Sequence, residues 1–298
     1  MKKSLALLLA LLMVSLSGCA AAEDMTIMAT FYPVYVLAEN VLDGVEGVTL
    51  SSMTPPGTGC LHDYQLLTSD MRALAKASAL LINGAGMEAF LPDVLSQFPD
   101  LPVIDCSQGV DLIAEEEKDG DDHDHDHGEY NAHIWLAPEN AIQMVRNLRD
   151  GLAALLPAQA ERIAANADAY IGRLSALNEE LRAAIEPLPH KRIVTFHEAF
   201  PYFARAYGLE VVAVVALEPD EPISPRMLKR VIEQVRAAGN PPLFSEPQYE
   251  NTALRTVAKE TGAAVYELDP LVTGDGQKTA YEDVMRKNLL VLLEALGD

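Results

Sequence analysis

The sequence has few basic residues and no long apolar run. Its 298 residues include 22 Lys and Arg against 44 Asp and Glu, which gives a formal net charge of −22. A surface this acidic repels phosphates and lacks a basic stripe, so we expect no nucleic-acid partner and an attraction for cations instead. The apolar run near the N-terminus is shorter than the ~20 residues that a membrane-spanning helix requires.

Cysteine is also scarce, and the first of the three, Cys19, closes the segment Leu-Ser-Gly-Cys after two lysines and an apolar run. This order is typical of a secretion signal, and its ending resembles a bacterial lipobox, in which the cysteine is lipidated and becomes the mature N-terminus. We predict a signal peptide over residues 1–18 and an extracytoplasmic protein that is anchored to the cell membrane through Cys19. An ordinary signal peptide is the alternative.

The remaining cysteines are Cys60 and Cys106. An even pair in an exported protein is interpreted first as a disulfide, because that compartment is oxidising. Two thiols are the alternative that the sequence leaves open.

Short apolar runs alternate with amphipathic stretches along the rest of the chain. This alternation predicts an α/β fold with largely parallel sheets. The roughly 280 residues after the signal exceed the comfortable size of one core, so we expect two domains. Ser224 and Pro225 are placed to start a helix, and Gly239 and Gly262 to end helices.

An amphipathic stretch between the two halves predicts one long helix. Its apolar residues recur at spacings of three and four: Ile163, Ala167, Tyr170, Leu174, Leu177, Leu181 and Ile185. Flanking prolines favour a rigid strut between two lobes, while an ordinary packing helix of the second domain fits the same pattern.

Polar residues that could bind a metal follow the predicted strands or precede a helix. His62, His133, His197 and Asp269 occupy such positions, where ligands bind in doubly wound sheets. Three imidazoles and one carboxylate form a set suited to tetrahedral zinc. The four are far apart in sequence, so no local spacing supports them.

The segments HDYQLLTSD, NAHIWLAPENA, VTFHEAFPYFARAYGL and AAVYELDPL, in this order after a lipobox, resemble the metal-binding receptors of bacterial zinc and manganese ABC importers. The resemblance covers essentially the whole mature chain. It implies two α/β lobes of mostly parallel sheet flanked by helices and joined by one long rigid helix, with the metal in the cleft between them. Applied here, it gives an N-terminal lobe over 19–156, a linking helix over 157–187 and a C-terminal lobe over 188–298.

The resemblance also assigns the ligands and the partner. The ligands fall on His62, His133, His197 and Asp269. The third of these ligands, His197, resembles the zinc receptors of the family, which have histidine at this position, whereas manganese members usually have glutamate. Zn²⁺ is therefore the expected cargo and Mn²⁺ the less favoured one. The implied partner is an ABC permease, and we expect a monomer.

The chain departs from the family pattern around two of these positions. Asn131-Ala132 replaces the usual Asp-Pro before the second histidine, which removes a carboxylate that could orient His133. Cys60, close to His62, is unusual. It could pair with Cys106, which we favour, or approach the metal as a thiolate.

An acidic, histidine-rich segment over residues 114–130 lacks the apolar content of a core and is predicted to be a loop. One interpretation is a solvated charged loop. The other, which the resemblance favours, is an accessory metal-capturing loop that uses His123, His125 and His127.

Taken together, these features predict a zinc receptor and no enzyme. A secreted zinc hydrolase is one alternative, but its zinc would need an open position for water, and HEAFP lacks the second histidine of H-E-x-x-H. A surface adhesin with a structural metal is another alternative and differs only in its partners.

Overall fold

The structure of the chain is a computed structural model that describes residues 24–55, 57–61, 64–115, 129–215, 223–249 and 252–297. The predicted signal peptide with Cys19, the candidate ligand His62, and the loop histidines His123, His125 and His127 lie outside the described residues. What the sequence predicts for them therefore stays a prediction.

The N-terminal sheet contains the parallel strands β1 (Met25–Ala29), β2 (Val48–Ser52), β3 (Ala79–Ile82) and β4 (Val103–Asp105), in the order β2-β1-β3-β4. Strand β3 is buried along its whole length, as a parallel strand covered on both faces should be. Helices α2 (Tyr32–Val41), α3 (Thr68–Leu74) and α4 (Leu91–Gln97) follow β1, β2 and β3. A proline in the first turn helps to fix where α2 and α4 begin.

The C-terminal sheet repeats this plan with β5 (Arg192–Thr195), β6 (Glu210–Val214), β7 (Leu243–Ser245) and β8 (Val265–Glu267), in the order β6-β5-β7-β8. Its helices are α7 (Pro201–Tyr207), α8 (Pro225–Ala237) and α9 (Thr252–Thr261). The hydroxyl of Ser224 accepts the Met227 N–H at the start of α8, which confirms the predicted cap. The predicted α/β class with two parallel sheets is confirmed.

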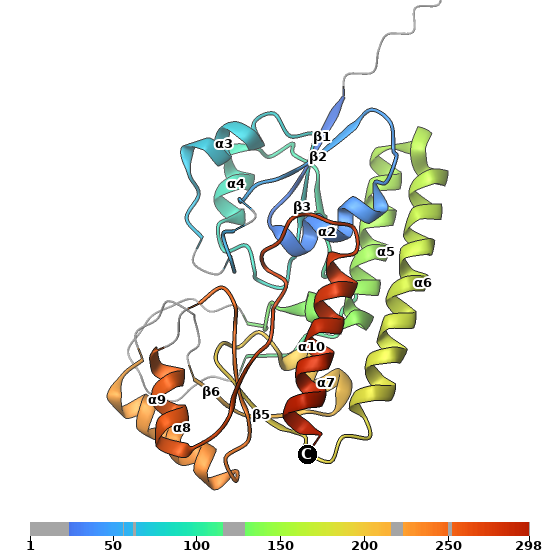
Figure 1. Cartoon of the computed structure of the whole chain (residues 1–298). Helices are drawn as coiled ribbons and strands as arrows, with labels where there is room; N and C mark the ends of the chain where they lie inside the picture. Colours follow the sequence, from blue (N-terminus) through green and yellow to red (C-terminus); the bar gives the residue numbers. More distant parts are fainter. Residues whose placement is uncertain are drawn as a thin grey trace, which may run out of the picture.

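Long helices connect the two sheets. The short helix η1 (Ile134–Leu136) leads into α5 (Pro138–Leu155), and the turn η2 (Pro157–Gln159) leads into α6 (Ala160–Ile185), which has 26 residues. Figure 1 shows α5 and α6 side by side along one side of the molecule, with α10 (Ala280–Leu296) beside α6.

The buried face of α6 is the predicted apolar stripe. It consists of Ile163, Ala167, Tyr170, Leu174, Leu177, Leu181 and Ile185. Because α6 packs against α5, α2 and α10, it contributes to a core as well as linking the sheets. The lobe boundaries given above remain a prediction.

In both sheets, polar candidate ligands lie in the segments that follow the carboxyl ends of the strands. The strand order reverses between β1 and β3 and again between β5 and β7, the positions where ligands bind in doubly wound sheets. Cys60 lies in the connection after β2, His197 follows β5 and Asp269 follows β8. Within the described ranges, no helix is long and apolar enough to cross a membrane.

Candidate metal centre

Three side chains that are distant in sequence meet between the two sheets. The Nε2 atoms of His133 and His197 lie 3.1 Å apart, and Cys60 Sγ lies 3.4 Å from His133 Nε2. The candidate donor atoms of these three residues all lie within 4.8 Å of one another. Both histidines are almost fully buried and Cys60 is half-buried. The structure therefore brings two of the predicted ligands, His133 and His197, close together, with Cys60 beside them.

The spacing of these donor atoms fits a tetrahedral cation. Zinc binds nitrogen near 2.0–2.1 Å and sulfur near 2.3 Å, so adjacent ligands of one ion lie about 3.3–3.8 Å apart. The separations of 3.1 and 3.4 Å are close to that range. Two of the three separations among side chains from separate halves of the chain thus already approach those in a coordination tetrahedron.

His133 is held by its neighbours so that Nε2 faces the cluster. Asn131 Oδ1 lies 3.3 Å from His133 Nδ1 and accepts the His133 backbone N–H at 3.1 Å. Because an amide oxygen can only accept, this contact favours the tautomer in which Nδ1 carries the proton and Nε2 keeps its lone pair for a metal. Asn131 therefore supplies the hydrogen-bond acceptor for His133 that the aspartate usual in the family would supply. The sequence had not predicted this role for Asn131.

Trp135 packs beside His133, with ring centroids 5.2 Å apart. Its indole N–H donates to the carbonyl of Pro270 at 2.8 Å, and the Tyr281 hydroxyl donates to the Trp135 carbonyl at 2.7 Å. Because Pro270 follows Asp269, the indole ties the His133 segment to the segment that carries the fourth predicted ligand.

Asn131 also joins the segments of the two histidines. Its Nδ2 donates to the carbonyl of Glu198, the residue after His197, at 2.9 Å. The Tyr202 hydroxyl, from α7, donates to the carbonyl of Asn131 at 2.7 Å. The relative positions of His133 and His197 are thus fixed by hydrogen bonds between the two halves.

Asp269 does not belong to the three-residue cluster within the described part of the chain. Its Oδ1 accepts the Leu271 N–H at 2.9 Å and a Gln248 side-chain N–H at 3.2 Å. Its backbone is clamped by Asn288, which accepts the Asp269 N–H and donates to the Asp269 carbonyl. Neither Gln248 nor Asn288 was predicted from the sequence. The signal that could have indicated Asn288 is an asparagine on the apolar face of α10, where it is buried.

The preferred disulfide between Cys60 and Cys106 is wrong, since neither residue forms one in the structure. Cys60 lies beside His133, whereas Cys106 follows β4 and is fully buried in the core. Burial raises the pKa of the Cys106 thiol well above its ordinary value. The arrangement matches the alternative in which Cys60 approaches the metal position.

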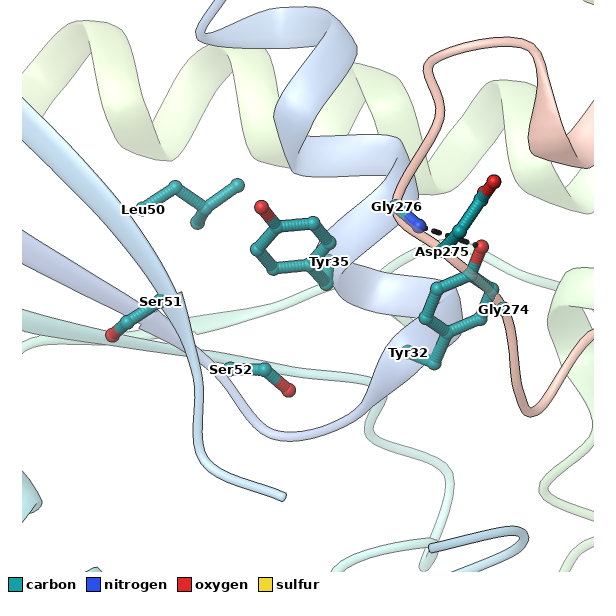
Figure 2. Close-up of a pocket in the computed structure, with 8 residues that line it drawn as sticks. All are labelled: Tyr32, Tyr35, Leu50, Ser51, Ser52, Gly274, Asp275 and Gly276. Carbon is teal, nitrogen blue, oxygen red and sulfur yellow. Dashed lines mark hydrogen bonds between the residues drawn. The ribbon is translucent and has the colours of Figure 1, made fainter. Parts of the chain in front are cut away.

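A pocket of about 330 Å³ lies between the two halves, and none of the three cluster residues lines it. Tyr32 and Tyr35 of α2 and the end of β2 line one side, and residues 274–276 line the other (Figure 2). The Gly276 N–H donates to the Tyr32 hydroxyl at 3.3 Å. None of its lining residues is a candidate metal ligand, so we assign it no part in metal binding.

The chain is similar to known metal-binding proteins over nearly its full length. It is 31% identical to the zinc-binding lipoprotein AdcA of Streptococcus pneumoniae serotype 4, covering 97% of this chain and 59% of that protein. It is 28% identical to the manganese-binding lipoprotein MntA of Halalkalibacterium halodurans, covering 94% of each. The chain thus spans about three-fifths of the length of the AdcA relative.

Solved structures agree with this likeness. The solute-binding protein FpvC of Pseudomonas aeruginosa in complex with Mn²⁺ has a TM-score of 0.82 at 28% identity, covering 92% of this chain and 98% of that one. A zinc-bound deletion mutant of ZnuA has a TM-score of 0.77 at 26% identity, covering 92% and 98%.

The family described as "Zinc-uptake complex component A periplasmic" matches residues 27–295. This range includes both sheets, the long helices and all three residues of the cluster. The chain therefore belongs to the family of periplasmic A components of zinc-uptake complexes.

Proposed function

We propose that this protein is an extracytoplasmic receptor that captures Zn²⁺ between the carboxyl ends of its two sheets and delivers it to an ABC permease. The observation that carries the proposal is the meeting of His133 and His197, from different halves of the chain, with their Nε2 atoms 3.1 Å apart. The two buried nitrogens are within hydrogen-bonding distance of each other without a metal, and a cation between them would use the lone pairs of both.

The proposed cargo site comprises His62, His133, His197 and Asp269. His133 and His197 are already oriented toward one another. Asp269 could bind the metal while Gln248 still donates to its Oδ1, because its carboxylate has a second oxygen and further lone pairs available. A fourth protein ligand closes the coordination sphere, which suits capture and release and leaves no open position for a hydrolytic water.

Nitrogen donors support Zn²⁺ over Mn²⁺ as the cargo. Imidazole is a ligand suited to zinc, while manganese favours carboxylate, carbonyl and water oxygens. The relatives include a zinc-binding and a manganese-binding lipoprotein, so their names do not choose between the two metals. The choice of Zn²⁺ therefore depends on the donor atoms of this chain. His197 in place of a carboxylate favours zinc.

The remaining parts of the proposal concern how the receptor is held and supplied. We propose that residues 1–18 are removed and that lipidated Cys19 anchors a monomer to the membrane. The lobes over 19–156 and 188–298 would bound the cleft, with the helix over 157–187 between them. His123, His125 and His127 would gather zinc for the tight site.

A thermal unfolding experiment tests the proposal. Zinc that binds only the folded chain should raise the melting temperature, and it adds ~2.7 kcal/mol of stability when free zinc is a hundredfold above its dissociation constant. The protein is first stripped with a chelator and then melted with and without zinc, at a pH where histidine is neutral.

A matched pair of variants serves as the control. His133→Ala combined with His197→Ala should abolish the rise, whereas His190→Ala, which removes an exposed histidine, should leave it intact. An unchanged melting temperature of the unmodified protein in saturating zinc would contradict the proposal.

A further inference from the structure

The side chain of Cys60 lies where a metal ligand would lie. Its Sγ is 3.4 Å from His133 Nε2, the distance expected between a sulfur and a nitrogen that share one zinc ion. It is also one of only three residues in the described part of the chain whose donor atoms cluster within 4.8 Å. At this distance the thiol can donate a hydrogen bond to His133 Nε2 while no metal is bound, so the sulfur already faces the nitrogen that would bind the metal.

Cys60 contacts two residues that come from opposite halves of the molecule. Its backbone N–H donates to the Tyr249 hydroxyl at 3.5 Å, across the boundary between the sheets. On the other side, Met87 Sδ lies 4.0 Å from Cys60 Sγ. The thiol is therefore placed by contacts from both halves, with a second sulfur beside it.

The position of Met87 is fixed by the buried residue that follows it. The Glu88 carboxylate accepts hydrogen bonds from Thr30 Oγ1, the Asn83 N–H and the Gly84 N–H at 2.7, 2.7 and 3.1 Å. This clamp joins the ends of β1 and β3, and Met87 itself is fully buried. The sulfur side of the cluster is thus built into the N-terminal sheet.

The oxygen ligand is less ready than the sulfur. Asp269 Oδ1 is engaged by Gln248 and by the Leu271 N–H, and Asp269 stands outside the three-residue cluster of the described chain. Cys60 Sγ, by contrast, already lies 3.4 Å from His133 Nε2. The donors already in place are two nitrogens and one sulfur.

We propose that the Cys60 thiolate coordinates the bound cation together with His133 and His197, and that this sulfur makes the site selective for thiophilic cations over Mn²⁺. The inference rests on the proposed metal-binding function and revises its donor set, because in a four-coordinate site the sulfur would take the position given above to Asp269. As the metal–sulfur bond forms, the S–H bond breaks and the proton passes to solvent. Thiolate favours zinc and softer ions, whereas manganese binds it weakly, so Cys60 contributes to the choice of cargo.

Cobalt substitution of the full chain tests the proposal, because Co²⁺ occupies zinc sites and shows its ligands in its spectrum. A thiolate ligand gives a sulfur-to-cobalt charge-transfer band in the near ultraviolet, whereas nitrogen and oxygen ligands leave only the weaker visible bands. We expect the near-ultraviolet band in the unmodified protein at one equivalent of cobalt. Zinc should remove it by competition.

Three matched cysteine variants locate the ligand. Cys60→Ser should lose the near-ultraviolet band and keep visible bands from the remaining ligands, while Cys19→Ser and Cys106→Ser should retain it. The zinc-to-manganese affinity ratio of Cys60→Ser should fall on the order of tenfold or more, since even loss of an outer partner of a ligand changes metal affinity that much.

The outcomes separate this inference from the proposed function. Visible cobalt bands without a near-ultraviolet band in the unmodified protein would show that metal binds without the thiolate, which overturns the role of Cys60 and leaves the receptor intact. A band that persists in Cys60→Ser would do the same. Failure of the unmodified protein to bind either cobalt or zinc would overturn the receptor function, and this inference with it.

Discussion

The two sheets share one topology but differ in what packs against them. Helices α2, α5, α6 and α10 bury their apolar faces in a large cluster that includes the residues of the N-terminal sheet. The C-terminal sheet divides its residues: Ile193 and Phe244 belong to the large cluster, while Val194 and Leu243 belong to a smaller one with α8 and α9. Successive strand residues face opposite sides, so this sheet is a wall shared by both clusters.

This difference indicates which parts of the molecule support the metal centre. The inner face of the C-terminal sheet packs into the same core as the segment carrying His133, whereas α8 and α9 form an outer cover. Helices α8 and α9 each bury only two residues, Val231 and Val235 in α8 and Leu254 and Val257 in α9. The walls of the centre should therefore be rigid toward each other, and the outer cover should contribute less.

The candidate ligands of the two halves also differ in how well they are oriented before a cation binds. His133 already has its ring oriented by Asn131 and Trp135, so little freedom is lost when a cation arrives. Asp269 is oriented by hydrogen bonds to its Oδ1 and lies outside the cluster of the described residues, so its carboxylate must move toward the cation. Preorganisation should make the N-terminal donor dominate the affinity.

The largest expected effect compares His133 with the acidic loop. His133→Ala removes a preorganised ligand and should weaken tight zinc binding by several orders of magnitude. Deleting residues 115–128 should leave the tight site nearly unchanged and remove only weak binding events, because the sequence predicts a charged loop there with too little apolar content for a core. Calorimetric zinc titration of both variants measures this.

The deletion is practical because Ala114 and Tyr130, at the two ends of the loop, pair in an antiparallel bridge. Their proximity allows a short connection. The comparison fails if the deletion abolishes tight binding while His133→Ala preserves it.

The next effect compares the two hydrophobic clusters through one kind of substitution. Leu174 on α6 lies in the large cluster and Leu254 on α9 in the smaller one, and both are buried. Buried Leu→Ala changes destabilise proteins by about 2–5 kcal/mol, less where the site can collapse. We expect Leu174→Ala near the upper end and Leu254→Ala near the lower end, as measured by urea unfolding of the metal-free protein.

Zinc titration of the same two variants is the control. Leu254→Ala should retain the zinc affinity of the unmodified protein, because the outer cover does not position the cluster. If Leu254→Ala is the more destabilising change, or if it alone weakens zinc binding, the outer helices support the centre after all.

The fold could be predicted from sequence because its signals are local. The stripe from Ile163 to Ile185 and the cap at Ser224 depend on residues a few positions apart, and the structure confirms both. The βαβ alternation likewise predicted parallel sheets, since buried parallel strands are continuous apolar runs.

The site was predictable only in part, because its contacts are distant in sequence. His133 and His197 were indicated by their places at strand and helix ends, but their approach depends on how the two sheets pack. The spacing of Cys60 and Cys106 contains no information on their separation in space, so the preferred disulfide was wrong. The clamp on Asp269 comes from Asn288, on a helix whose pattern shows only that this residue is buried.

The smallest expected effect compares the hydrogen-bond partners of the two ligands. Asn131→Ala removes the acceptor of His133 Nδ1 and the donor to the Glu198 carbonyl, so the imidazole can turn and the two histidine segments separate. Loss of such an outer partner reduces metal affinity about 10–100-fold. Gln248→Ala instead removes one hydrogen bond to Asp269 Oδ1, and the carboxylate can bind the metal with or without it, so zinc affinity should change little.

Asn131→Asp distinguishes the two roles of Asn131, because it keeps an oxygen for Nδ1 and loses the donor to Glu198. An added negative charge next to Nδ1–H also favours an imidazole that shares its other nitrogen with a cation. We expect zinc affinity in the order Asn131→Asp above Asn131→Ala, with Gln248→Ala close to the unmodified protein, as measured by competition with a zinc-binding dye. Were Gln248→Ala to weaken binding more than Asn131→Ala, the C-terminal half would be the preorganised one, because the bond from Gln248 would then be holding Asp269 in its metal-binding position.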